Sequence, residues 1–271
     1  MNSKTNLALL KEGRRVSKRK KFAPVQLSRK IEIYYTKELL EISRQCQIEG
    51  DQILEITRDS SRFVGDVAVG DAPAWLTAVK SVVFGGITRK VKGASDAIAK
   101  KVVTRQAKAT DEALAKQIKD MTGIEAQKFI KKQKLGKIVD DSIAANVSLI
   151  KSIPIKYHER LERLVLVAVQ NGKPQSWLEH QVKRLGKTTD ARAKLIARDQ
   201  IAKINGSVVK ERHKQLGVDE YYWQTCKDER VRPKHRKREG EKFRWDSPPD
   251  GGHPSEEVNC RCGAIPVLDD A

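Results

Sequence analysis

Cysteine, aromatic residues and long apolar runs are all scarce in this sequence, and each scarcity excludes a class of protein. Four cysteines in 271 residues do not make the framework of a disulfide-rich secreted scaffold. Aromatic residues make up 5% of the chain, which argues against an all-β sandwich. No stretch approaches the roughly 18 uncharged apolar residues that span a bilayer, and Lys4, Lys11 and Arg14 interrupt any signal-like run. We expect a soluble protein that stays in the cytoplasm where it is made, without a membrane partner.

Acidic residues are outnumbered, and the excess of basic residues predicts a polyanionic partner. The chain has 54 Lys and Arg against 35 Asp and Glu, a net charge of +19. Nucleic acid is the usual partner of so basic a chain. Two interpretations of the basic N-terminal segment stay open: a solvated tail, or an arm that neutralises phosphates of double-stranded DNA without sequence preference. The predicted DNA-contacting residues of that arm are Lys11, Arg14, Arg15, Lys18, Arg19, Lys20 and Lys21.

Apolar residues at three- and four-residue spacing predict that most of the chain is helical. One such pattern covers residues 25–48 and is expected to end at Gly50. The glycines and proline between residues 65 and 86 suggest short helices joined by turns. A long charged helix is predicted over about residues 95–121.

The helical pattern continues through the second half of the chain, and we expect it to be interrupted at Pro154, at a turn over residues 171–174 and at Gly186. A helix over residues 140–152 is expected to stop at Pro154. Residues 156–216 fit three helices. Gly186 is expected to end the second of these, and residues 188–190 offer an N-cap for the third.

The composition changes after Gly217. Three short segments, 221–225, 243–245 and 264–268, have strand-like composition, and prolines and glycines separate them. Three short strands bury little apolar surface, so another feature must hold this region together. The predicted fold class is therefore α+β and predominantly α-helical, with long helices followed by a small irregular C-terminal β module.

Three of the four cysteines and two of the five histidines lie within 37 positions. Neutral imidazole and thiolate are the preferred zinc ligands, and four of them close a tetrahedral structural site. The predicted ligands are His235, His253, Cys260 and Cys262, with Cys226 as a substitute. A structural zinc would replace the missing core of the β module. The alternative is that these are ordinary thiols and hydrogen-bonding histidines in a compact loop.

Two further groups in this region have a functional and a structural interpretation. Asp228 could act with His235 on phosphodiesters, but we favour a salt-bridged turn around Asp228. The aromatic residues Trp223, Phe243 and Trp245 could stack on nucleic-acid bases. Their positions on predicted strands favour a small core instead.

Several short motifs follow one another in the second half of the chain. These are AlaArgAspGln (197–200), Tyr222-Trp223, AspGluArgValArgProLysHis (228–235), Gly240, PheArgTrpAsp (243–246), Pro248-Pro249, GlyHisPro (252–254) and AsnCysArgCys (259–262). In type and order these motifs resemble a known family, the phage Mu F-like head morphogenesis or minor head proteins, and the resemblance covers about residues 150–268. Many relatives carry Cys-x-x-Cys where this chain has Arg232 and His235, and arginine does not bind zinc.

The resemblance implies a structural protein of a tailed phage or prophage, not an enzyme. Such a protein is expected in the interior of the virion head, and in the host cytoplasm during assembly. Its expected partners are the portal protein, the capsid interior and packaged double-stranded DNA. The predicted organisation is a basic N-terminal arm over 1–24, a helical region over 25–150 and a Mu F-like head morphogenesis domain over 151–271.

Two alternatives differ in kind from a head protein. One is a metal-dependent nuclease that uses Asp228, His235 and His253 and keeps an open position on the metal. The other is a cytoplasmic nucleic-acid regulator without a particle, but no helix-turn-helix or zinc-finger helix is recognisable in the sequence.

Overall fold

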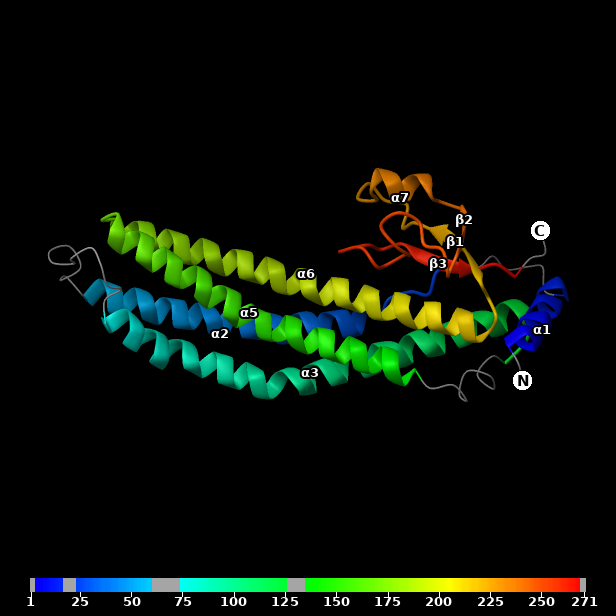
Figure 1. The fold of residues 1–271 in the computed structure, drawn as a ribbon, viewed down its shortest axis with the longest axis horizontal. Helices are drawn as coiled ribbons and strands as arrows, with labels where there is room; N and C mark the ends of the chain where they lie inside the picture. Colours follow the sequence, from blue (N-terminus) through cyan, green and yellow to red (C-terminus); the bar gives the residue numbers. More distant parts are fainter. Residues whose placement is uncertain (1–2, 17–22, 60–73, 126–134, 269–271) are drawn as a thin grey trace. The chain divides into compact units, whose positions relative to one another are not determined.

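The computed structural model describes residues 3–16, 23–59, 74–125 and 135–268 (Figure 1). The predicted fold class is confirmed: the long helices are followed by a small antiparallel sheet. No helix in these ranges is both long and apolar enough to cross a membrane.

The chain divides into two compact units. Unit 1 comprises Met1–Glu32, Lys101–Ser142 and Arg198–Ala271, and unit 2 comprises Ile33–Lys100 and Ile143–Ala197. Single helices, such as those that contain residues 32–33 and 197–198, contribute to both units.

The long helices run through positions where breaks were expected. Gly50, Pro154 and Gly186 all lie inside helices, so the predicted stops at these residues are wrong. The predicted turns at Gly85 and Gly86 are also absent. The long helices are α1 (Ser3–Val16), α2 (Arg29–Asp59), α3 (Ala74–Thr122), α5 (Gly136–Gln170) and α6 (Gln175–Gln215). The sequence also predicts a helix over about residues 125–133, and this segment falls largely outside the described residues.

Two of the unexpected glycines serve close helix packing in unit 2. A Cβ on Gly50 would lie 2.2 Å from Oη of Tyr157, and one on Gly186 would lie 2.9 Å from Cδ of Gln47. A larger residue at either position would force the facing side chain, Tyr157 or Gln47, to move. Glycine leaves that space free, at a cost in helix propensity of about 1 kcal/mol.

The residues expected to cap a helix at 188–190 bond within α6 and to α2 instead. The hydroxyl of Thr189 donates to the Leu185 carbonyl at 2.9 Å. Asp190 accepts hydrogen bonds from Ser43 at 2.7 Å and from Gln47 at 3.1 Å. These polar contacts join two helices of unit 2. They occupy the side chains that were expected to cap a helix, and α6 continues through them.

Helix α5 continues through Pro154 because the apolar residues before and after this proline are buried. Ile150, Ile153, Tyr157 and Leu161 are each at most 1% exposed. Their combined burial outweighs the roughly 3 kcal/mol that a proline costs inside a helix.

The basic N-terminal segment is a packed helix over residues 3–16, so the solvated-tail interpretation is wrong there. Leu10 of α1 is 2% exposed, and it packs into an apolar cluster of unit 1. The other buried members of that cluster are Leu114, Ala115, Ile118, Leu216, Val218 and Leu268. The helix thereby anchors the basic residues that it carries.

The sheet has strand order β2-β1-β3, and all its pairs are antiparallel. The strands are β1 (Glu220–Gln224), β2 (Lys242–Arg244) and β3 (Gly263–Pro266), and β1 is central. Trp223 and Trp245 are buried in the same cluster as Cys260 and Cys262. The aromatic residues therefore form the module's core, as their strand positions predicted.

In unit 1, the module packs against the 198–215 part of α6 (Figure 1). At Gly206 the loop after His253 comes so close that a Cβ would lie 2.9 Å from Cβ of Ser255. Ser255 itself has a φ of 73°, a left-handed conformation that makes the loop costly to move. Gly206 thus fixes the distance between helix and loop.

We expect Gly206→Ala to destabilise unit 1 by about 1–3 kcal/mol, because the added methyl group overpacks this contact. The loss should appear in urea unfolding followed by tryptophan fluorescence. Gly93→Ala is the matched control, since nothing lies within 4 Å of its Cβ position in α3. That change should be neutral or stabilising by up to about 1 kcal/mol. Equal effects of the two substitutions would contradict the packing role of Gly206.

Candidate metal centre

Three buried side chains form one compact group in unit 1: His235, Cys260 and Cys262. Nδ1 of His235 lies 3.7 Å from Sγ of Cys260 and 3.5 Å from Sγ of Cys262. The three ligand atoms all lie within 4.8 Å of one another. The structure thus brings together three of the four residues that the sequence predicts as zinc ligands.

The ligands come from two segments of the module. His235 lies on the short helix α7 (Pro233–Lys237), and its ring meets the Trp223 ring edge-on, with 5.1 Å between the centroids. Cys260 and Cys262 lie just before β3. The group therefore joins α7 to the strand that ends the module.

A carboxylate lies on the other side of the imidazole. Oε2 of Glu257 is 3.1 Å from Nε2 of His235, while Nδ1 faces the sulfurs. Lys234 and Arg232 also pair with Glu257, and the hydrogen bond from Lys234 is the main cause that lowers the pKa of this carboxyl group. With the carboxylate on the Nε2 side and the two sulfurs on the Nδ1 side, Nδ1 is the ring nitrogen that faces the proposed metal position.

The two thiols influence each other's ionisation. A hydrogen bond from the Cys262 side chain lowers the pKa of the Cys260 thiol, despite its burial. The same contact and burial raise the pKa of the Cys262 thiol. The pair therefore releases its first proton readily and its second one reluctantly, unless a cation takes the place of the shared proton.

The residues fit a zinc ion. Zinc binds thiolate at about 2.3 Å and imidazole at about 2.0 Å, so a tetrahedral centre sets nitrogen and sulfur about 3.5 Å apart. The distances from His235 to the two sulfurs match this spacing. Arg232 donates to the Val258 carbonyl at 2.7 Å and is not part of the ligand group.

Hydrogen bonds from α6 hold the cysteine loop in place. The buried carboxylate of Asp199 accepts from the Asn259 amide at 2.7 Å and from Lys203 at 2.9 Å. Ser255 donates to the Cys262 carbonyl at 3.0 Å. Asp199 therefore pairs with the module and is more than an ordinary charge on a helix face. The sequence leaves this pairing with the module open but favours an ordinary charge pair of Arg198 and Asp199 on the helix face, and it gives no signal for Glu257.

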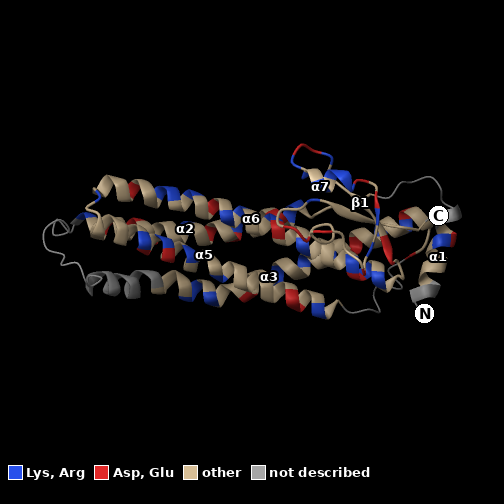
Figure 2. Ribbon diagram, turned by 45° about the horizontal axis from the view of Figure 1, so that its top comes forward, with Lys and Arg blue, Asp and Glu red and all other residues tan. Residues whose placement is uncertain are grey.

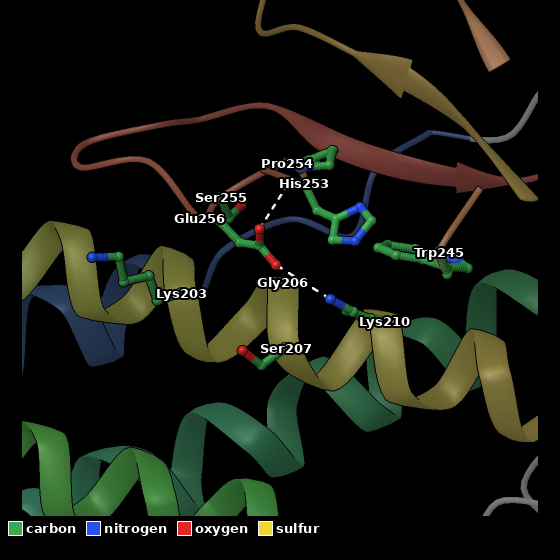
Figure 3. A pocket seen from close by; sticks show the side chains of 9 residues that line it. All are labelled: Lys203, Gly206, Ser207, Lys210, Trp245, His253, Pro254, Ser255 and Glu256. Atoms are coloured by element: carbon green, nitrogen blue, oxygen red, sulfur yellow. Dashed lines mark hydrogen bonds and ion pairs between the residues drawn. The ribbon is translucent and has the colours of Figure 1, made fainter. Parts of the chain in front are cut away.

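His253, the fourth predicted ligand, lies outside this group. Its Nδ1 is 2.9 Å from the Tyr221 hydroxyl, and its ring packs against Trp245. His253 lines a cavity of about 190 Å³ between α6 and the loop over residues 253–256 (Figure 3). Burial is the main cause that lowers its pKa, which favours the neutral ring. Lys210 reaches Glu256 across this cavity at 3.3 Å.

The three residues of the nuclease alternative, Asp228, His235 and His253, each contact different neighbours. Arg261 binds the Asp228 carboxylate through two nitrogen atoms, one of them at 2.8 Å, and this contact is the main cause that lowers the pKa of Asp228. The favoured prediction of a salt-bridged turn is thus confirmed. In the described part of the chain, neither Asp228 nor His253 joins His235 in a metal-ligand group. Cys226, the predicted substitute ligand, is exposed and also lies outside that group.

The structure describes only part of the predicted DNA-binding arm. Lys11 lies on α1 and is half-buried. Arg14 and Arg15 belong to the same helix, but the placement of their side chains is not described. Lys18, Arg19, Lys20 and Lys21 lie outside the described residues.

Comparison with known proteins confirms the resemblance found in the sequence. Residues 159–265 match the family described as "Phage Mu protein F like protein", and this range includes the strands β1 and β2, helix α7 and the His–Cys–Cys group. An uncharacterized protein of Haemophilus influenzae is 31% identical over 252 residues, which cover 92% of this chain. The chain spans 56% of the length of that relative. No solved structure matches.

Proposed function

We propose that this chain, whose residues 159–265 form a phage Mu F-like module, is a structural minor head protein of a tailed phage or prophage. The match to that family is the observation that carries the proposal. In this role the protein acts in head morphogenesis, at the portal and the inner face of the capsid, where it meets packaged DNA. The net charge of +19 supports a polyanionic partner independently of the match.

The metal centre in this proposal is structural. His235, Cys260 and Cys262 would hold a zinc ion, and Glu257 would orient His235. Zinc supplies the cross-link that three short strands with a small aromatic core lack. A zinc ion held by these three ligands keeps a fourth position that no other His, Cys, Asp or Glu of the described residues fills within the group. The burial of the ligands and the binding of Asp228 to Arg261 are what favour a structural role over the nuclease alternative.

The N-terminal basic residues supply the proposed contact with double-stranded DNA. We expect a variant with Lys18, Arg19, Lys20 and Lys21 all changed to glutamine to lower the slope of log affinity against log salt by about 3–4, since each phosphate contact contributes about 0.9. Fluorescence anisotropy with a duplex of arbitrary sequence measures the slope. Substitution is preferable to deletion of residues 1–21, because Leu10 is part of the core. An unchanged slope would exclude these four residues as the contact.

The head assignment is tested in cells in which the parent phage or prophage is induced. Particles are purified on a density gradient, and the chain is detected by mass spectrometry. We expect it to sediment with heads and to persist through washes in high salt. Its absence from particles would overturn the assignment. Metal-dependent nicking of plasmid DNA that is lost in His235→Ala would establish the nuclease alternative instead.

A further inference from the structure

We infer that the surface around α7 is a second contact surface for the phosphates of double-stranded DNA. This inference rests on the DNA contact proposed above and places part of it on the C-terminal module. Residues 230–238 read Arg-Val-Arg-Pro-Lys-His-Arg-Lys-Arg, with six basic residues and no acidic one. Figure 2 shows Lys and Arg concentrated along α7.

Three exposed cations of this segment have no acidic partner among the described residues. Arg230, Arg236 and Lys237 are all exposed, and none of them pairs with a carboxylate in that part of the chain. Lys234 and Arg232 share the single carboxylate of Glu257. Two cations on one carboxylate leave an excess of positive charge at the surface. Such charges remain available for an external anion.

The fold holds this surface in a fixed shape. His235 lies between Lys234 and Arg236 in the chain, yet it is buried against the two cysteines. The Arg238 guanidinium stacks over the Trp223 ring, 5.1 Å from its centroid. A short basic segment anchored in this way loses little conformational freedom when it binds, which favours affinity.

The surrounding chemistry indicates a duplex and phosphate recognition. The nearby aromatic residues Trp223 and Trp245 are buried in the core, so they offer no platform on which unpaired bases could stack. Lysine and arginine side chains alone bind the backbone and carry no sequence information. The surface therefore suits sequence-independent contact with packaged double-stranded DNA.

The test is a triple variant of the full chain, Arg230→Gln, Arg236→Gln and Lys237→Gln. Binding to a duplex of arbitrary sequence is measured by anisotropy over a range of salt concentrations. The slope of log affinity against log salt should fall by about 2–3, because up to three phosphate contacts are lost. Circular dichroism and zinc content should match those of the wild type, since all three residues are exposed.

A matched control removes the same charge elsewhere. Lys183→Gln, Arg184→Gln and Lys187→Gln change three exposed residues of α6 in unit 2. The control should keep the wild-type slope. If the two triple variants behave alike while the wild type binds DNA, the α7 surface is excluded and the proposed DNA contact stands. If the wild type itself shows no salt-dependent binding, both proposals fail.

Discussion

Changing Cys262 to serine is expected to abolish zinc binding and to unfold the C-terminal module. Cys262 is a proposed ligand and also a buried member of the aromatic core. A serine hydroxyl does not replace a thiolate on zinc, and loss of a structural metal removes several kcal/mol of folding free energy from a small module. Elemental analysis after dialysis should give almost no zinc, and limited proteolysis should cleave between residues 217 and 268. The helices of unit 2 should remain resistant.

Cys226→Ser is the matched control for this experiment. It removes an exposed thiol from the same module but from outside the three-ligand group. Zinc content and the unfolding midpoint should stay at wild-type values. Because Cys262→Ser removes packing as well as a ligand, the wild type is also treated with a chelator. It should lose the same protection and regain it when zinc is added. A Cys262→Ser protein that keeps equimolar zinc and wild-type stability would contradict the proposed centre.

Stability is expected to fall as the pH drops below about 6.5, and His213 should cause much of that fall. This residue of α6 is 1% exposed, and neither ring nitrogen has a hydrogen-bond partner in the described part of the chain. Burial lowers its pKa from 6.5 to about 3. Between these values the unfolded chain binds a proton that the folded chain does not. The free energy of unfolding therefore decreases by about 1.4 kcal/mol per pH unit as the pH falls.

His213→Phe tests this prediction, because phenylalanine keeps an aromatic ring beside Trp245 and does not titrate. Urea unfolding of both proteins is measured between pH 8 and pH 4.5. The stability difference between them should shift by about 2–3 kcal/mol in favour of the variant at the acidic end. Groups such as Asp228, whose pKa is lowered, affect both proteins equally and cancel in the difference. A constant difference across this range would show that His213 does not control the acid sensitivity.

The sequence predicts the parts of the fold that depend on local pattern. The three strands and the helical character of the long segments follow from period and composition. The continuity of the helices does not follow from period and composition, because it depends on contacts with residues far away in the chain. Gly50 and Gly186 read as helix ends, but in the structure they make room for Tyr157 and Gln47. Local propensity was outweighed by tertiary packing.

For the candidate site, too, the sequence predicts what depends on residue type and does not predict what depends on distant contacts. Residue type and clustering predicted His235, Cys260 and Cys262, because imidazole and thiolate groups that lie close together in a sequence are typical of zinc sites. The position of His253 depends on its bond to Tyr221, which spacing does not reveal. Asp199 lies 60 residues before its partner Asn259, and nothing local distinguishes it from other helix charges.

In the proposed protein, a metal held by these three buried ligands takes the place of a larger core, so that the module is an architectural part and not a substrate site. The most direct test is the zinc content of the wild-type chain, purified without a polyhistidine tag and dialysed exhaustively. We predict about one zinc ion per chain. Less than about a tenth of that amount, in a protein whose tryptophan fluorescence and circular dichroism show a folded module, would contradict it.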